Sequence, residues 1–239
     1  MRVLSFSEKG CIRKNNEDSY LVLPAYGLCA VADGMGGHRA GEVASSTALQ
    51  ELEKLVPRLE GITGQNLENG LIESFIQANR VVYESSTTEP ENAGMGTTLT
   101  VLLVRSTTAV IAHAGDSRAY LWREERLTPL TKDHSLVGEL VRLGQISLEE
   151  AEKHPQRHVL MRAVGADQKI EVDCQSIGLQ VGDVFLLCTD GLSNMISDRE
   201  LADEFLKQGS WEERLERLRQ LTFERGAPDN FTALCCILE

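Results

Sequence analysis

The sequence has no long hydrophobic run and no paired-cysteine motif, and each absence excludes a class of protein. No apolar stretch approaches the roughly 18–20 residues that a membrane-spanning helix needs. Residues 1–10 carry charges and lack the apolar core of a signal peptide. None of the six cysteines belongs to a C-x-x-C pair, and most lie in apolar runs, so we expect buried free thiols in a cytoplasmic protein. Cys235 and Cys236 are neighbours in one expected strand, so one should face inward and the other outward.

Basic residues are scarce, because 24 Lys and Arg stand against 36 Asp and Glu in 239 residues, which gives a net charge of −12. Proteins that bind nucleic acids or anionic membranes gather Lys and Arg on one surface, so neither partner is expected. The acidic excess fits either a uniformly solvated surface or carboxylates that are gathered to hold cations. The length and the 42% of hydrophobic residues predict one domain over residues 1–239 with a sizeable core.

The spacing of apolar residues predicts strands and helices that come in groups. Strands are expected at residues 3–7, 20–24, 28–32, 98–104, 109–114, 119–123, 170–177, 184–188 and 230–238. Helices are expected at residues 42–55, 67–83, 198–207 and 211–223, with a polar loop at 85–94 and a polar, helical insert at 133–165. Because the strands and helices do not alternate strictly, the chain is expected to belong to the α+β class.

Three expected strands each end at an acidic residue with a glycine beside it. These acids are Asp33, Asp116 and Asp190, and a fourth, Asp229, precedes the last expected strand. A single Asp-Gly pair usually marks a hairpin turn. If instead the strands that carry Asp33 and Asp190 are neighbours in a sheet, their carboxylates converge and need cations to neutralise them. Carboxylate oxygens without His or Cys ligands select hard cations such as Mg²⁺, Mn²⁺ or Ca²⁺, and both interpretations stay open at this point.

The glycine-rich stretch 34–42 does not fit a nucleotide-binding loop. A P-loop needs Lys where Glu42 stands, and a G-x-G-x-x-G motif needs Gly where Arg39 stands. The stretch is better explained as backbone left bare around an ion, with a glycine carbonyl available as a ligand. Arg13 is either a solvated surface residue or, beside a metal centre, the planar donor that a phosphate needs.

Seven short segments resemble, in this order, the metal-dependent protein phosphatases of the type 2C serine/threonine family in its compact bacterial form. They are residues 13–18 (RKNNED), 31–38 (VADGMGGH), 94–98 (GMGTT), 114–118 (AGDSR), 130–135 (LTKDHS), 188–192 (CTDGL) and 228–230 (PDN). Together they span nearly the whole chain. The resemblance implies an α-β-β-α sandwich of two antiparallel sheets flanked by helices, with a variable flap at 133–165.

The resemblance also implies a centre of two Mg²⁺ or Mn²⁺ ions. Asp33 resembles the carboxylate that bridges the two ions, and Gly34 would offer its backbone carbonyl to the second ion. Asp190 and Asp229 would complete the protein ligands of the first ion.

Other residues would surround that centre. Glu17 and Asp18 resemble the acidic pair that holds the second ion, mostly through water, and Asp116 matches a third, weaker metal site. Arg13 matches the arginine that binds the substrate phosphate. Together with Asp33 and Asp190, Arg13 is therefore expected to be essential for catalysis.

The implied reaction is direct attack of a metal-activated water on the phosphorus of phosphoserine or phosphothreonine in proteins. Phosphorylated proteins and a cognate Ser/Thr kinase are the expected partners, and the chain is expected to be a monomer. Met35 stands where some members have a His proposed as general acid, and Asn194 where some have an extra aspartate. His38 and the other histidines are expected to be structural. A catalytically silent domain of this fold and a phosphatase of small metabolites are the alternatives.

Overall fold

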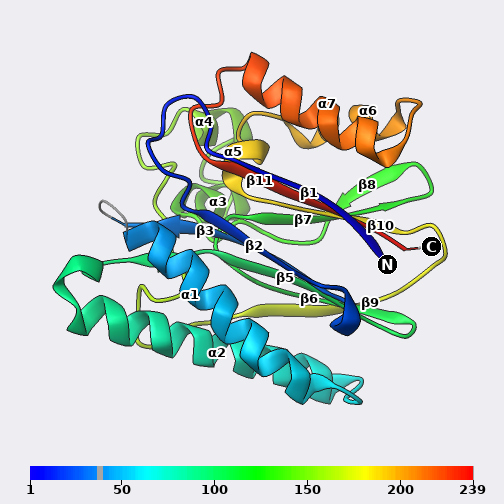
Figure 1. The fold of residues 1–239 in the computed structure, drawn as a ribbon. Coiled ribbons are helices and arrows are strands. Elements are labelled where there is room, and N and C mark those ends of the chain that lie inside the picture. Colours follow the sequence, from blue (N-terminus) through cyan, green and yellow to red (C-terminus); the bar gives the residue numbers. More distant parts are fainter. Residues whose placement is uncertain (37–39, 239) are drawn as a thin grey trace.

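Two antiparallel sheets lie face to face in the chain, with helices on both outer faces (Figure 1). The structure is a computed structural model that describes residues 1–36 and 40–238. The arrangement confirms the α+β class and the four-layer α-β-β-α sandwich. In the part of the chain that the structure describes, no helix combines the length and the apolar character that crossing a bilayer requires.

Each sheet combines strands from distant parts of the sequence. The first sheet runs, in spatial order, β1 (Arg2–Glu8), β11 (Phe231–Ile237), β10 (Val184–Cys188), β7 (Arg118–Arg123) and β8 (Arg126–Pro129). The second runs β2 (Asp18–Leu23), β3 (Leu28–Met35), β5 (Leu99–Arg105), β6 (Thr108–Ala114) and β9 (Asp173–Gly178), with β4 (Gly96–Thr97) paired to the end of β3. The first and last strands of the chain are therefore neighbours in one sheet.

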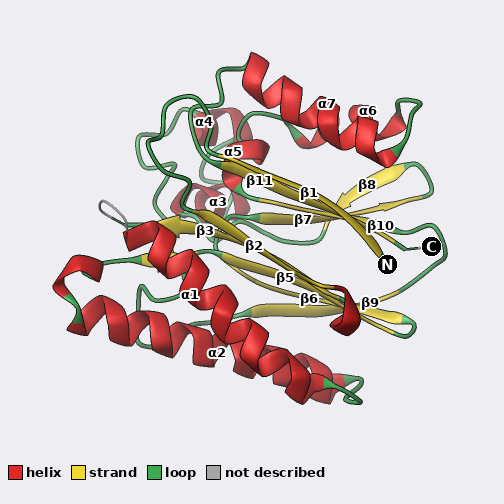
Figure 2. Cartoon of the chain, viewed as in Figure 1, coloured by secondary structure: helices red, strands yellow, loops and turns green. Residues whose placement is uncertain are grey.

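The helices cover the sheets because their apolar residues recur on one side. Helices α1 (Ala40–Leu55) and α2 (Gln65–Thr88) pack on the second sheet, and α6 (Asp198–Leu206) and α7 (Trp211–Glu224) pack on the first (Figure 2). The shorter helices are α3 (Leu136–Arg142), α4 (Leu148–Glu152) and α5 (Asp190–Ser193). Short 3-10 helices lie at Pro24–Tyr26, Val56–Leu59 and Pro90–Asn92.

Apolar side chains fill all three interfaces between the four layers. Phe75 lies between the second sheet and its helices, Phe185 between the two sheets, and Phe205 between the first sheet and its helices. Burying each of these rings contributes about 1.5–3 kcal/mol to stability. Cys235 and Cys236 face opposite sides of β11, as alternation predicts, but both are buried because helices also cover the outer face.

The structure corrects several expected boundaries. Strand β3 continues to Met35, because β2 and β4 pair with its last residues. Helix α2 continues to Thr88, so the expectation of a loop over the whole of 85–94 is wrong. The insert 133–165 is helical only in α3 and α4, and α4 begins with a capping box at Ser147. Strand β8 and helix α5 were not expected, because four residues are too short to show a period.

Candidate metal and phosphate site

Asp33 lies inside strand β3, and its cross-strand partner on β2 is Asp18. The backbone N–H of Asp33 donates to Thr98 Oγ1 at 2.9 Å, and the Thr97 hydroxyl donates to the Asp33 carbonyl at 2.9 Å. Directly paired residues of antiparallel strands lie about 4.5–5.5 Å apart between Cα atoms. The pairing therefore brings two carboxylates together at one edge of the second sheet.

The Asp18 carboxyl group is held by residues that belong to the other sheet. Thr189 Oγ1 and Thr232 Oγ1 each donate to Asp18 Oδ2 at 2.8 Å, whereas Oδ1 is buried without a hydrogen-bond partner among the described residues. Burial raises the pKa of Asp18 to about 7, the threonine hydrogen bonds oppose this rise, and the charges of Asp190 and Asp229 add to it. A buried carboxylate oxygen without a donor is costly unless a proton or a cation satisfies it.

Asp190 begins helix α5, where Asn194 Nδ2 donates to its Oδ2 at 3.0 Å. Its carboxyl group interacts directly with that of Asp33, and two carboxylates this close need a proton or a cation to offset their repulsion. Burial raises the pKa of Asp33 well above its usual range, and the neighbouring charges of Asp18 and Asp190 raise it further. Burial also raises the pKa values of Asp116 and Asp190. We term Asp18, Asp33, Asp116 and Asp190 the acidic cluster.

The acidic cluster is rich in oxygen atoms, but its side chains alone do not form a complete metal-coordination site. Within residues 1–36 and 40–238, no three His, Cys, Asp or Glu side chains are arranged as a complete metal site. The cluster nevertheless combines buried, mutually interacting carboxyl groups with the unpartnered Oδ1 of Asp18. Mg²⁺ and Mn²⁺ prefer oxygen donors, and backbone carbonyls and water usually complete their coordination. The residues present therefore fit hard divalent cations.

The glycines that follow Asp33 and Asp190 are required by close packing. Neither Gly34 nor Gly191 has a positive φ, so neither occupies the left-handed conformation of a primed hairpin turn. A Cβ added to Gly191 would lie 1.9 Å from the carbonyl oxygen of Asn230, and one added to Gly34 would lie 2.0 Å from that of Gly41. The interpretation of these Asp-Gly pairs as hairpin turns is therefore wrong.

Arg13 and Asp229 form an ion pair beside the cluster, with 2.7 Å between Arg13 Nη2 and Asp229 Oδ2. The Arg13 side chain remains 52% exposed, so its guanidinium group is accessible. The backbone N–H of Glu17 donates to Asn230 Oδ1 at 2.9 Å, and Asn230 Nδ2 donates to the carbonyl of Asn15 at 2.8 Å. Asn230 therefore ties the segment that carries Arg13 and Glu17 to the start of β11.

Three threonines without a role expected from the sequence, Thr98, Thr189 and Thr232, hold the backbone of Asp33 and the carboxyl group of Asp18. Thr98 and Thr189 lie inside the matched segments GMGTT and CTDGL, which is the signal that pointed to them. Thr232 lies outside the matched segments. Its role follows only from the packing of β11 beside the start of β2.

A cleft of about 1540 Å³ opens beside the acidic cluster. Its lining includes Arg13, Asp116, Asp190 and Asp229, together with residues of the insert 133–165. Three candidate metal ligands, the candidate phosphate-binding arginine and part of the insert therefore face the same cleft.

Two buried histidines join the insert to the edge of the cluster. The rings of His113 and His134 pack with centroids 4.7 Å apart. The backbone N–H of Gly115 donates to His134 Nδ1 at 3.2 Å, and the His134 carbonyl accepts from the N–H of Met161 at 2.8 Å. These contacts fit the structural role expected for both histidines. His38 lies outside the described residues.

Comparison with known proteins agrees with the geometry. Residues 2–145 match the family model described as Protein phosphatase 2C. The serine/threonine phosphatase stp of Listeria welshimeri is 38% identical over 232 residues, which cover 95% of this chain and 92% of that protein. The chain belongs to the protein phosphatase 2C family.

Solved phosphatase 2C structures share the whole fold. The crystal structure of the Mycobacterium tuberculosis serine/threonine phosphatase PstP/Ppp superposes with a TM-score of 0.90 at 39% identity, covering 100% of this chain and 98% of that one. A crystal structure of the catalytic domain of PstP in complex with two manganese ions gives a TM-score of 0.87 at 36% identity, with the same coverage of both chains. The resemblance to the type 2C phosphatases is thus confirmed.

Proposed function

We propose that the cleft beside the acidic cluster is where this chain hydrolyses phosphoserine and phosphothreonine in proteins. Family membership makes the chain a serine/threonine protein phosphatase of the 2C type, and the proposal concerns how its residues perform the reaction. The observation that carries it is that Arg13, Asp116 and Asp190 line one cleft, and that Asp33 interacts with both aspartates from behind this lining. Two Mg²⁺ or Mn²⁺ ions, when bound, would supply an activated water as the nucleophile and stabilise the charge on the phosphate.

The residues that would hold the ions offer oxygen donors around the cluster. They are Asp33, Gly34, Asp190, Asp229, Glu17, Asp18 and, for a third and weaker ion, Asp116. Their clustering supports this role, because a nearby cation favours the ionised form of a carboxyl group whose pKa has been raised by burial. The hydrogen bonds from Thr189 and Thr232 orient Asp18 so that its Oδ1, which has no hydrogen-bond partner among the described residues, is available as a metal ligand.

Arg13 would bind and orient the phosphate group of the substrate. A guanidinium group carries five N–H donors, and the pair with Asp229 uses only Nη2. No other side chain that the structure describes bonds the remaining nitrogens, which can bind two phosphate oxygens in the bidentate geometry that arginine favours. The ion pair with Asp229 thus positions the arginine without occupying it fully.

The test is hydrolysis of a phosphothreonine peptide with Mn²⁺, with Mn²⁺ plus EDTA, and by the variants Asp33→Asn and Asp190→Asn. We expect EDTA to abolish activity and each variant to lose at least about 100-fold in kcat/KM, equivalent to about 2.7 kcal/mol of transition-state stabilisation. Asp203→Asn makes the same change at an exposed position of α6 and should retain activity. Equal activity in all samples would refute the metal mechanism.

We further propose that residues 1–239 form a single catalytic domain with a flap at 133–165, and that the chain acts as a cytoplasmic monomer opposing a Ser/Thr kinase. Light scattering tests the monomer, and phosphoproteomics with and without the phosphatase identifies sites shared with a kinase.

A catalytically silent domain would bind no Mn²⁺ in calorimetry. A metabolite phosphatase would hydrolyse sugar phosphates faster than phosphopeptides.

A further inference from the structure

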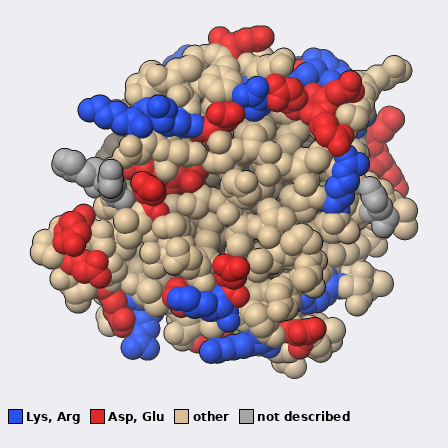
Figure 3. Space-filling view, in the orientation of Figure 1, with Lys and Arg blue, Asp and Glu red and all other residues tan. Residues whose placement is uncertain are grey.

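The cleft differs in charge from the rest of the protein. The face drawn in Figure 3 shows Lys and Arg interspersed with Asp and Glu, and the chain as a whole carries −12. In the lining of the cleft, apart from Arg13 and the candidate ligands Asp116, Asp190 and Asp229, Lys and Arg outnumber Asp and Glu by seven to four. An acidic protein has thus gathered positive charge beside its candidate catalytic site.

Part of this positive charge is neutralised within the cleft. Arg118 pairs with Asp133 at 2.7 Å, and Arg162 pairs with Asp173 at 2.9 Å. Arg142 pairs with Glu139 in the same way, at 2.5 Å. These pairs account for most of the acidic residues in this part of the lining, so they do not balance the remaining cations.

Four lining cations form no ion pair with any side chain that the structure describes. They are Lys132, Lys153, Arg157 and Arg199, and all four are exposed. The first lies just before the insert, the next two lie within it, and Arg199 lies in the first turn of helix α6, on a different part of the cleft wall. Cations from separate segments therefore face one space without acidic partners of their own.

We propose that these four residues form an anion subsite that selects phosphoprotein segments carrying a second anionic group near the phosphorylated residue. The group is a carboxylate or a second phosphate, because both offer the oxygens that Lys and Arg bind. The volume of about 1540 Å³ exceeds that of a typical small-ligand pocket and suits an extended peptide. The inference rests on the proposed function, since it places the phosphorylated side chain at the acidic cluster.

The expected preference is moderate and sensitive to salt. A partly exposed ion pair contributes about a two- to fivefold change in affinity, so several contacts together give a preference on the order of tenfold. Salt weakens such contacts, because the Debye screening length is about 8 Å at 0.15 M ionic strength. A preference that rests on these cations must therefore shrink as the salt concentration rises.

The test compares kcat/KM for matched phosphothreonine peptides whose flanking positions carry neutral residues, glutamates, a non-hydrolysable phosphonate or lysines. With Mn²⁺ at low salt, we expect the glutamate or phosphonate peptide to be hydrolysed about tenfold better than the neutral one, and the lysine peptide more slowly. Preference for glutamate assigns the carboxylate, and preference for the phosphonate assigns the second phosphate. Equal rates on neutral and anionic peptides would overturn the inference while leaving the proposed function intact. A failure to hydrolyse any of the peptides would contradict the proposed function itself.

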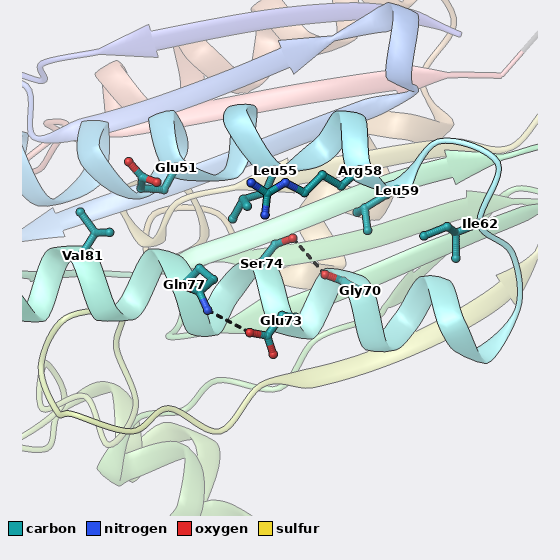
Figure 4. A pocket seen from close by; sticks show the side chains of 10 residues that line it. All are labelled: Glu51, Leu55, Arg58, Leu59, Ile62, Gly70, Glu73, Ser74, Gln77 and Val81. Carbon is teal, nitrogen blue, oxygen red and sulfur yellow. Dashed lines mark hydrogen bonds between the residues drawn. The ribbon is translucent and has the colours of Figure 1, made fainter.

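The variants K153A/R157A and Arg199→Ala should bring the ratio of anionic to neutral kcat/KM toward one. The ratio is internal to each variant, so a loss of folded protein does not change it. Arg58→Ala is the matched control, because Arg58 is an exposed arginine that lines a separate groove of about 570 Å³ between α1 and α2 (Figure 4). An equal loss of preference in the Arg58 variant would also overturn the inference.

Discussion

Asp18 and Thr189 join the two sheets of the sandwich through a hydrogen bond of 2.8 Å from the threonine hydroxyl to Asp18 Oδ2. Asp18 begins β2 of the second sheet, whereas Thr189 directly follows β10 of the first. Thr232 of β11 donates to the same oxygen. Because Asp18 is also the cross-strand partner of Asp33, these bonds fix the acidic cluster relative to the first sheet.

Replacing Thr232 by valine should weaken metal binding. The substitution keeps the shape of the side chain but removes a hydrogen bond to a buried carboxylate, a bond worth about 1.5–3 kcal/mol. Residues that orient metal ligands typically change metal affinity by about 10–100-fold when mutated. We expect a loss of this size in calorimetric titration with Mn²⁺. Thr222→Val is the control, because the hydroxyl of this buried threonine donates to the Leu218 carbonyl within α7, and equal affinities in both variants would contradict the prediction.

Replacing Gly191 by alanine should destabilise the protein and its site. The added methyl group would lie 1.9 Å from the Asn230 carbonyl, so the backbone beside Asp229 must move. We expect a loss of at least about 1–3 kcal/mol in urea unfolding, the usual range for overpacking. At Gly178 nothing lies within 4 Å of the added atom, so Gly178→Ala should leave stability nearly unchanged. Equal stabilities of the two variants would show that the close approach is unimportant.

The buried imidazole of His113 should make the protein less stable in acid. Burial, together with the charge of His134, lowers the pKa of His113 from 6.5 to about 4. Between these values the unfolded chain binds more protons than the folded chain, so stability falls as pH drops from 6.5 toward 4. The loss amounts to roughly 2–3 kcal/mol at pH 4.5.

The measurement is urea unfolding of the wild type and His113→Gln at pH 4.5 and 7.5. The variant lacks the titrating group, so its free energy of unfolding should change less between the two pH values. The comparison within each protein removes the constant cost of the substitution. Identical pH dependence in both proteins would assign the acid sensitivity to other groups.

Replacing Asn79 by alanine should loosen the C-terminal end of the insert. The Gly165 N–H donates to Asn79 Oδ1 at 2.7 Å, and Asn79 Nδ2 donates to the Asp167 carbonyl at 3.0 Å. Asn79 is 1% exposed, and its removal leaves the N–H of the buried Gly165 unsatisfied, at a cost of about 1–3 kcal/mol. Hydrogen exchange should accelerate at residues 162–168. Asn69→Ala, at an exposed position of the same helix, should leave that exchange unchanged.

Long periodic segments were predictable because their pattern repeats within a few residues. Helix α7 and strand β10 lie where apolar spacing places them, and α7 begins with a capping box at Ser210. Helix α5 escaped detection because it has only four residues, and it is the element that carries Asp190. Local periodicity therefore finds the framework better than the short elements at its functional edge.

The sequence by itself determined the long strands and helices and placed acidic residues at or near the ends of strands, because both are encoded in short stretches of chain. Only the tertiary structure decided which of those acids meet. Asp18 contacts Thr232 across 214 positions of sequence, a contact that depends on how two sheets stack. The same stacking explains Gly191, whose missing side chain leaves room for Asn230 and does not make a turn. Contacts of this kind arise from the packing of layers, and no local pattern records them.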